Sequence, residues 1–593
     1  MHLKRSFYQL GSLAGLLCLA AVVAIRPGHG QAPAPKAAAA PTTSVTLIHI
    51  GDIHGHLVPR ANTRRDATGR SAGGIARMHT RIEEIRKRRK NTLLLNTGDT
   101  IQGSAEALFT RGQAMIDVLN LLKIDYFAPG NWDFVYGPER FIELFGEVRP
   151  KAPWGTVAAN LYYDGAPYAD KTGKNVVPPY RIRQLGPLKV GIIGLTTRRG
   201  PQVVGKDVTK GFKFTSGDEE IPRLLKELKE GHKVDLVVLL SEQELANNIR
   251  LAEKNPGINV ILSSDMHEVT RRPIETTTGT IIVEEGQDGT MLGELTLEMT
   301  AGRVRSWSWT PHSIDERIPE SRVVAAKVAE VRKSFVTGPA FKKHKNPFNG
   351  TELARPIDTV VGQTKVALHR SGFTSDAEPA VIEGSSHNFL TDAFRTIAKA
   401  DIGAIRGFRY GTHVAPGPIR MEDLYHYIPI GPMIAKGTIK GQQLKNQLEN
   451  SAEGALSPDV ASWAGGWLFN FSGVTADIDP GAGKGKRASN IRVKRADATE
   501  PAPLDPAATY SYASYYYAAD PTFINVVPAT DISILKDEAG NPLDGVEIVV
   551  RYLATLPAKT VVAMPTRLRL TAPLPAPAFG NPEIQPLRGV PPR

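Results

Sequence analysis

The sequence predicts an α/β protein, α+β when the whole chain is considered, built from two domains. Short β-branched runs alternate with amphipathic helical runs over residues 44–317, which is the pattern of an α/β domain with a largely buried sheet. A second region, residues 356–572, begins with a strand-like run, continues with a helical stretch over residues 386–398 and ends in short strands. At 593 residues the chain is also too long for a single hydrophobic core.

The N-terminal segment has the pattern of an export signal. Lys4 and Arg5 precede the apolar run Leu13–Ile25, and the small residues Gly28 and Gly30 follow. The apolar run is shorter than the ~20 residues that cross a bilayer, which favours a cleaved signal over a membrane anchor. We therefore expect a periplasmic protein, exported by the Sec or the twin-arginine route, without stable membrane insertion after cleavage.

Composition changes along the chain indicate where the domains begin and end. The segments rich in Ala and Pro, or in Pro alone, cannot bury enough apolar surface to order themselves. The expected segments are a signal peptide (1–30), an Ala- and Pro-rich tether (31–43), a first domain (44–317), a linker helix and loop (318–355), a second domain (356–572) and a Pro-rich tail (573–593).

The single cysteine, Cys18, lies inside the predicted signal. Disulfides, cysteine nucleophiles and thiolate metal ligands are therefore not expected, and His, Asp, Glu and Asn are left as metal-binding side chains. The net charge is +12 and the basic residues are spread along the chain. This distribution favours a solvated surface over nucleic-acid binding, and it suits a small anionic substrate.

Five apolar runs of the first domain each end close to side chains that can bind metal. Ligands bind beyond the carboxyl ends of the strands in open α/β sheets, so we expect the five loops to converge above one sheet. One such pair alone is more often a turn, but the ordered set indicates a metal site. The candidate ligands are Asp52 and His54 after residues 44–50, Asp99 after 92–95, Asn131 after 126–128, Glu242 after 234–240, and Asp265 and His267 after 260–262.

This ligand set fits two adjacent divalent cations, with Asp99 placed to bridge them through its two carboxylate oxygens. Two cations about 3.5–4 Å apart can deprotonate a shared water and stabilise both the attacking and the leaving oxygen of an in-line displacement. The predicted chemistry is hydrolysis at a tetrahedral centre, with Asp99 essential to it.

The order Asp52 and His54, Gly98 and Asp99, Gly130 and Asn131, then Asp265 and His267 resembles the calcineurin-like metallophosphoesterases. The second region, with Asn388, Asp392, Ala393, residues 407–410 and residues 441–448, is similar to the C-terminal domain of the 5′-nucleotidase family. The resemblance covers residues 46–570. It implies a four-layer αββα metallophosphoesterase domain followed by a 5′-nucleotidase-type C-terminal α/β domain.

Within this family the chain most resembles the SoxB-type thiosulfohydrolases of sulfur oxidation. The likeness rests on DTIQGSAEALFTRGQAMIDVLNLL from Asp99, GNWDFVYG from Gly130 and GFRYGT from Gly407. Trp132 and Val135 stand where nucleotidases carry a catalytic His and an Asp, and the SoxB branch also has Trp there. The resemblance therefore implies cleavage of a thiosulfonate, on a small anion or on a carrier protein.

The chain departs from both branches at two positions, because each would be expected to have His where this sequence has Glu242 and Asp265. If both bind metal, four carboxylates face two cations and the formal charge of the site is near zero. Such a site should attract a sulfate or phosphate group less, lower the pKa of the shared water less, and prefer harder ions. We therefore expect Mn²⁺, with Mg²⁺, Fe or Zn²⁺ as alternatives, and weakened or altered activity.

The resemblance also implies a substrate pocket in the second domain. Arg409 matches the Arg that binds the substrate anion, and Tyr517 lies near the position of an aromatic residue that stacks on a base, with Trp463 or Trp467 opposite. In the first domain, Trp132 is expected to form the pocket wall. Asp133 could relay a proton or cap the next helix.

Three hypotheses remain at this stage. The first is a two-metal hydrolase of thiosulfonates, the second a periplasmic 5′-nucleotidase or phosphomonoesterase, and the third a non-catalytic binding protein on the same fold. The changes at Glu242, Asp265 and Trp132 motivate the third.

Overall fold

The computed structural model describes residues 42–61, 70–265, 267, 269–270, 272–369, 382–405, 413–457 and 468–573. The predicted signal peptide, most of the tether and nearly all of the Pro-rich tail lie outside the described residues, as do Arg409, Trp463 and Trp467. The described helices include none that is both long and apolar enough to cross a membrane. The described residues from 42 to 573 belong to one compact unit.

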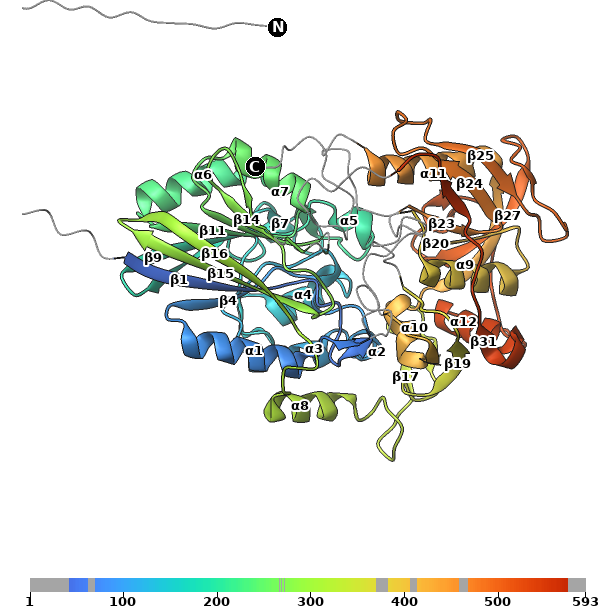
Figure 1. Cartoon of the computed structure of the whole chain (residues 1–593), viewed down its shortest axis with the longest axis horizontal. Coiled ribbons are helices and arrows are strands. Elements are labelled where there is room, and N and C mark those ends of the chain that lie inside the picture. The colour runs from blue at the N-terminus through green and yellow to red at the C-terminus, as the bar shows by residue number, and fades with distance from the viewer. Residues whose placement is uncertain are drawn as a thin grey trace, which may run out of the picture. The chain divides into compact units, whose positions relative to one another are not determined.

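The first sheet has six strands in the order β16-β15-β1-β4-β5-β6 (Figure 1). Strands β1, β4, β5 and β6 are parallel to one another, whereas β15 runs antiparallel to both β1 and β16. Their bounds are β1 Thr42–Ile50, β4 Thr92–Asn96, β5 Tyr126–Phe127, β6 Gly155–Thr156, β15 Met291–Thr300 and β16 Arg303–Ser313.

The second sheet also has six strands, in the order β13-β14-β12-β11-β9-β8. Its central strands β9, β11, β12 and β14 are parallel. The bounds are β8 Tyr180–Leu185, β9 Leu188–Leu195, β11 Leu236–Ser241, β12 Val260–Ser263, β13 Ile274–Glu275 and β14 Ile281–Val283.

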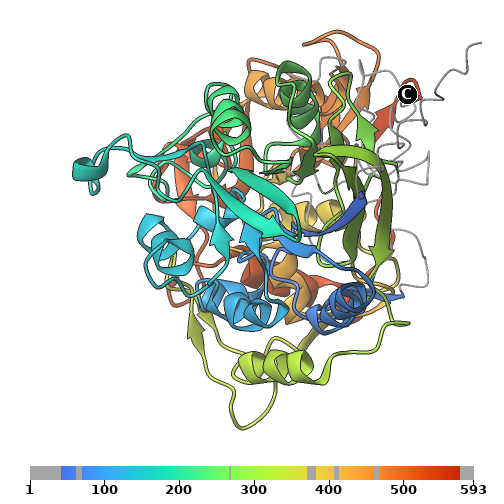
Figure 2. The same cartoon turned by 90° about the vertical axis from the view of Figure 1, so that its left-hand side faces the viewer.

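The two sheets face each other, and helices cover their outer faces. Val45 and Leu47 of β1 share one buried cluster with Val238 of β11, which is the layer between the sheets. Ile48 of β1 lies in another cluster with the apolar side chains of the helices α1 (Ile75–Arg88) and α3 (Gln113–Leu119). The outer face of the second sheet packs in the same way against α6 (Glu220–Lys226) and α7 (Leu245–Lys254). Because successive residues of a strand point to opposite faces, each sheet packs against the other sheet on one face and against helices on the other. The predicted four-layer αββα arrangement is therefore confirmed (Figure 2).

The second region forms its own sheets. The largest has the order β23-β20-β27-β22-β30, and two smaller ones have the orders β21-β19-β31 and β26-β25-β24-β32. The strands are β19 Val360–Thr364, β20 Ile402–Ile405, β21 Gly417–Arg420, β22 Met433–Lys440, β23 Asn470–Ser472, β24 Val474–Ile478, β25 Ala488–Val493, β26 Ala502–Pro503, β27 Thr509–Tyr516, β30 Thr530–Ile534, β31 Thr560–Val561 and β32 Leu568–Leu570. The helices are α9 Ser385–Ala398, α10 Met421–Tyr427, α11 Gly441–Leu456 and α12 Gly545–Thr555.

Short elements connect these parts. The linker predicted to be helical contains α8, Arg322–Arg332, which packs against α1 and α3. The remaining short elements are β2 Arg60–Ala61, β3 Ser71–Ala72, α2 Ala105–Phe109, α4 Pro138–Phe145, β7 Leu161–Tyr163, α5 Gly200–Val203, β10 Phe212–Phe214, β17 His344–Lys345, β18 Glu352–Leu353, β28 Phe523–Ile524 and β29 Val527–Pro528.

Candidate metal centre

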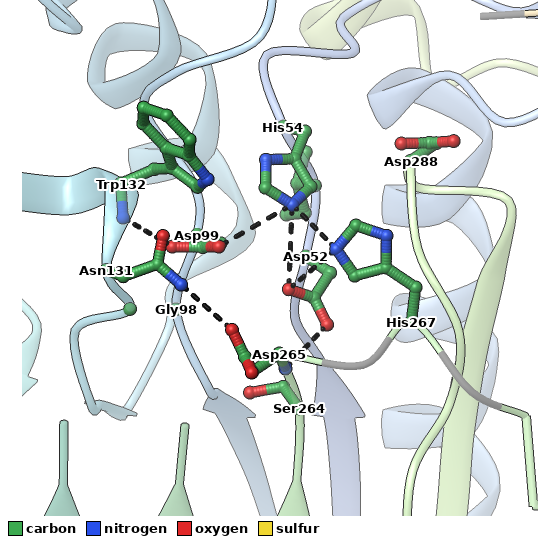
Figure 3. Close-up of polar contacts among 12 residues, drawn as sticks. Asp52, His54, Gly98, Asp99, Asn131, Trp132, Ser264, Asp265, His267 and Asp288 are labelled. Carbon is green, nitrogen blue, oxygen red and sulfur yellow. Dashed lines mark hydrogen bonds and ion pairs between the residues drawn. The ribbon is translucent and has the colours of Figure 1, made fainter. Parts of the chain in front are cut away.

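All seven predicted metal ligands meet in one buried site, where each is at most 3% exposed. The expectation of a single sheet was wrong. The loops after β1, β4 and β5 belong to the first sheet, whereas those after β11 and β12 belong to the second. The parallel strands of both sheets end at the same edge, so loops from the two layers converge there (Figure 3).

The first cluster consists of Asp52, His54 and His267, and one potential ligand atom of each lies within 4.8 Å of the others. The Nε2 atoms of His54 and His267 are 3.0 Å apart. Asp52 Oδ1 lies 3.6 Å from His54 Nε2 and 3.5 Å from His267 Nε2. Two imidazole nitrogens and a carboxylate oxygen thus face one point, as ligands of a divalent cation do.

The second cluster consists of Asp52, Asp99 and Glu242. Asp52 is common to both clusters, which is the place that the sequence analysis assigned to Asp99. Asp99 contacts both as well, because its Oδ2 lies 3.6 Å from His54 Nε2 while its Oδ1 accepts the Trp132 backbone N–H at 2.7 Å. The two clusters are therefore adjacent and linked by two carboxylates.

Unpartnered buried oxygens test whether cations fit this site. Both carboxylate oxygens of Glu242 and the Oδ1 of Asn131 are buried and have no hydrogen-bond partner among the described residues. Burying such groups without a partner is costly, and divalent cations would complete their coordination. Carboxylate, amide and imidazole donors together fit Mn²⁺, Mg²⁺, Fe or Zn²⁺.

Several carboxylates are crowded together in this site, and each disfavours the ionised form of its neighbours. Burial, and then the neighbouring charges of Asp52, Asp133 and Asp265, raise the pKa of Asp99 well above its usual range. Burial and the same group of carboxylates, with Asp99 first, raise the pKa of Glu242 well above its usual range. Bound cations would reverse these shifts by favouring the ionised forms.

The turns that carry the ligands have unusual backbone geometry. Asp52, His54, Asp99, Asp265 and His267 all have positive φ, between 44° and 83°. Non-glycine residues seldom adopt this region, and such strain concentrates at functional sites.

The turns after β4 and β5 also approach each other too closely for ordinary side chains. A Cβ on Gly98 would lie 2.2 Å from the Gly130 nitrogen, so a glycine is required where the two turns meet.

Asp265 takes part in the centre through hydrogen bonds. Its Oδ1 accepts from Asn131 Nδ2 at 2.9 Å and its Oδ2 from Arg199 Nη2 at 3.1 Å. Its backbone N–H donates to Asp52 Oδ2 at 3.1 Å. It belongs to neither three-residue cluster, and its role as a metal ligand stays a prediction.

Trp132 and Asp133 begin the 3₁₀ turn that follows Asn131. The indole of Trp132 lies beside Asn131 and Asp99 (Figure 3). Asp133 accepts the backbone N–H groups of Thr100 and Ile101 through Oδ1, at 2.9 and 3.2 Å, and that of Gly130 through Oδ2 at 2.8 Å. Asp133 therefore ties the turns after β4 and β5 together and does not cap a helix.

The predicted substrate residues are placed only in part. Arg409, Trp463 and Trp467 lie outside the described residues. Tyr517 follows β27 and is 39% exposed, and the described contacts of the metal centre do not include it.

Sequence reasoning missed a layer of residues around the ligands. Beneath the turns, His49 contacts Glu285 through Nδ1 at 3.0 Å and Thr97 through Nε2 at 2.9 Å. Beside Asp265, Arg199 and Glu244 form an ion pair at 2.5 Å. The signals that could have found this ion pair are Arg198-Arg199 after β9 and Glu244 shortly after β11, since these strands are neighbours in one sheet.

Two facing sheets that hold adjacent clusters of carboxylates and imidazoles at their strand ends define a metallophosphoesterase-type hydrolase. Comparison with known families agrees. Residues 45–269 match the calcineurin-like phosphoesterases and residues 360–522 match the 5′-nucleotidase C-terminal domain. The chain belongs to the metal-dependent hydrolases that combine these two domains.

Relatives and solved structures agree with this assignment. The chain is 24% identical over 540 residues to endonuclease YhcR of Bacillus subtilis, covering 88% of this chain but 41% of that protein. It is 24% identical over 500 residues to a snake venom 5′-nucleotidase of Naja atra, covering 79% of this chain and 88% of the relative.

Two solved structures show the same fold. A 5′-nucleotidase precursor from Thermus thermophilus has a TM-score of 0.71 at 22% identity, covering 90% of this chain and 100% of that one. The sulfate thiohydrolase SoxB from Thermus thermophilus has a TM-score of 0.72 at 21% identity, covering 89% and 96%.

Proposed function

We propose that this protein is an exported two-metal hydrolase that cleaves a sulfate group from a thiosulfonate. The observation that carries the proposal is the turn after β5, which offers no free acid to a leaving group. Trp132 has no proton to exchange at neutral pH, and both oxygens of Asp133 accept backbone N–H groups. A site without a general acid suits a leaving group of low basicity.

Thiosulfonate cleavage meets this requirement. An oxygen of water forms a bond to the terminal sulfonate sulfur, the sulfur–sulfur bond breaks, and the sulfane sulfur leaves as an anion. The products are sulfate, the sulfur anion and protons that pass to solvent. The leaving anion needs no proton from Trp132 or Asp133.

Each residue of the centre has a distinct role in this proposal. Asp52, His54 and His267 would hold one cation, and Asp52, Asp99, Glu242 and the Oδ1 of Asn131 would hold the other. When bound, two such cations supply a more acidic water and neutralise charge on the reacting group. Asp133 positions the turns, and Trp132 forms a wall that excludes water.

Our proposals for the substrate and its compartment rest on residues outside the described part of the chain. We propose that Arg409 binds the sulfonate, presented as a small anion or on a carrier protein, and that the signal-like N-terminal segment directs export to the periplasm. Nucleic acid is not an expected partner.

A second candidate function is hydrolysis of a nucleotide or another phosphomonoester. The match of residues 360–522 to the 5′-nucleotidase C-terminal domain favours it. Tyr517, 39% exposed after β27, is the aromatic residue that would stack on a base.

A paired release assay separates the two candidates. Manganese-loaded protein is incubated with an S-thiosulfonated cysteine peptide and, in parallel, with AMP and sugar phosphates. We expect sulfate release that exceeds phosphate release. Asp99→Asn should abolish the activity, and Asp117→Asn, an exposed change on α3, should preserve it. Phosphate release without sulfate release would select the nucleotidase function.

A further inference from the structure

We infer that Arg199 is a substrate-binding residue of the metal centre that contacts a sulfate- or phosphate-like anion. The inference rests on the proposed hydrolytic site, but it does not depend on which of the two anions is the natural substrate. Arg199 lies in the loop after β9, immediately before α5.

Two carboxylates hold Arg199 in place through one nitrogen. Its Nη2 lies 2.5 Å from Glu244 Oε1 and 3.1 Å from Asp265 Oδ2. The side chain of Arg199 is 19% exposed, whereas those of Glu244 and Asp265 are 4% and 2% exposed. The Arg199 guanidinium has no further partner among the described residues, so its other N–H groups are available to a ligand.

Asp265 connects this guanidinium directly to the metal clusters. The carboxylate that accepts from Arg199 also accepts from Asn131, and its backbone N–H donates to Asp52. Asp265 is therefore the single residue between Arg199 and two other predicted ligands, Asn131 and Asp52. A tetrahedral anion at the cations would lie within reach of a long side chain anchored there.

The charge balance indicates why an arginine is useful at this place. The carboxylates of Asp52, Asp99, Glu242 and Asp265 match the four positive charges of two divalent cations, and the buried carboxylate of Asp133 lies beside them, so these groups leave no surplus positive charge for an anion. Arg198 and Arg199 carry two positive charges and Glu244 carries one negative charge, so this group has a net charge of one positive unit. A planar guanidinium that keeps free donors binds sulfate and phosphate oxygens well.

The alternative is a purely structural ion pair, and the local geometry argues against it. Glu244 already pairs with Arg198 Nη2 at 3.1 Å, so a second arginine is not needed to neutralise it. Glu244 also has a φ of 68°, a conformation that costs energy. Strain in a buried residue that holds a partly exposed arginine is typical of a binding site.

Anion binding tests the inference without relying on turnover. Calorimetry at saturating manganese measures the affinity of the full-length protein for inorganic sulfate and inorganic phosphate. Of the two anions, the one that the wild type binds more tightly should bind to Arg199→Met with an affinity about 10- to 100-fold lower. This is the loss expected when a charge-assisted hydrogen bond is removed. Arg199→Lys, which keeps the charge but not the planar fork, should give an intermediate loss.

Arg198→Met is the matched control, because it removes a neighbouring charge on the same glutamate without touching Asp265. It should change the anion affinity less than about 3-fold, the effect of one partly exposed charge. Manganese content and thermal unfolding are measured for every variant.

Four results would overturn the inference. The first is that Arg199→Met binds anions as tightly as the wild type, and the second is that Arg198→Met causes an equal loss of affinity. The third is a loss of affinity explained entirely by lost manganese or by unfolding, and the fourth is that the wild type binds neither anion. Wild-type protein that binds the anion through Arg199 but hydrolyses no substrate would refute the proposed function and leave this inference standing.

Discussion

The buried side chain of Asp133 holds two turns of the candidate metal centre together through hydrogen bonds to their backbone. It connects the turn of Thr100 to the turn of Gly130, and so sets the distance between Asp99 and Asn131. Burial raises the pKa of Asp133 to about 6, although hydrogen bonds from backbone N–H groups lower it. We propose that its role is positional, because both of its carboxylate oxygens accept backbone N–H groups.

Replacing Asp133 tests this role at the scale of a single residue. Asp133→Ala leaves three buried N–H groups without their acceptor, so we expect the free energy of unfolding to fall by about 2–4 kcal/mol. Asp133→Asn should lower the free energy of unfolding less, because one side-chain oxygen remains to accept backbone N–H groups. Urea unfolding measures the stability, and calorimetry measures manganese affinity, which should fall with it.

A proton relay would behave differently. In that case Asp133→Asn would reduce kcat while stability and manganese affinity stayed at the wild-type values. The matched control is Asp125→Asn, since Asp125 also accepts a backbone N–H, from Leu94 at 2.9 Å, away from the clusters.

The residues of the site were predictable to different extents. Asp52, His54, Asp99, Asn131 and Glu242 follow buried strands directly, and the strand pattern placed them together. The shared position of Asp52 was not predictable, because it depends on a turn with φ of 44° that no local pattern specifies. Arg199 was not predictable either, since its role appears only when β9 and β11 are known to be neighbours.

At the scale of elements, the strand runs were the most predictable feature. The runs expected at 44–50, 92–95 and 260–262 correspond to β1, β4 and β12. Their division between two facing sheets was not predictable, because a strand buried on both faces reads as the same apolar run in either layer. The antiparallel pairing of β15 with β1 joins residues about 250 positions apart, and local sequence carries no signal for it.

Glu294 connects three of these elements. It lies on β15, where His312 of β16 contacts its Oε2 at 2.7 Å and Arg89, just beyond α1, donates to its Oε1 at 2.9 Å. Arg88 of α1 forms a further ion pair with it. Burial alone would raise the pKa of Glu294, but these partners outweigh burial and lower the pKa to about 2.

The lowered pKa of Glu294 predicts the direction in which stability changes with pH. The ionised form is favoured in the folded state, so its contribution is present above the usual pKa of about 4.3 and is lost as the pH falls towards 2. We expect Glu294→Gln to lower the free energy of unfolding by about 1–3 kcal/mol at pH 7. Urea titrations of both proteins from about pH 7 to pH 3 should show the difference shrinking, and a constant difference would contradict this account.

At the scale of the whole molecule, partly buried ion pairs join the first domain to the second. Arg332, the last residue of α8, pairs with Glu106 of α2 at 2.6 Å and with Glu422 of α10. Arg60 pairs with Asp423 of α10 as well. Removing one partner of a fully buried ion pair costs about 3–5 kcal/mol, and loss of Arg332 takes the cation away from Glu106 while Glu422 keeps its ion pair with Arg60.

Arg332→Met should therefore destabilise the junction. We expect the free energy of unfolding to fall by about 3 kcal/mol, and limited proteolysis to cut the segment between α8 and β19 sooner than in the wild type. Arg322→Met, at the first residue of the same helix, is the control. Equal protease resistance of the two variants would show that the Arg332 ion pairs do not hold the junction.

Metal removal tests the centre and the fold together. A cation that binds only the folded protein stabilises it by about 2.7 kcal/mol when its concentration is 100 times its Kd. Chelation should therefore lower the midpoint of thermal unfolding by several degrees, and added Mn²⁺ should restore it. An unchanged midpoint after verified metal loss would mean that the cations do not stabilise the folded state, contrary to binding at these clusters.

The stability of the metal-free protein should also depend on pH, because carboxylates are crowded together in its site. Burial and neighbouring charges raise the pKa values of Asp99 and Glu242, so the folded state binds protons that the unfolded state releases. Their contribution to stability is fully present below the usual carboxylate range and is lost as the pH rises through the raised pKa values. With chelator, urea unfolding should therefore show greater stability at about pH 5 than at pH 8, whereas saturating Mn²⁺ should remove most of this difference, because the cations take the place of the protons. Glu242→Gln should reduce the pH dependence of the metal-free protein, and the exposed change Asp117→Asn should not.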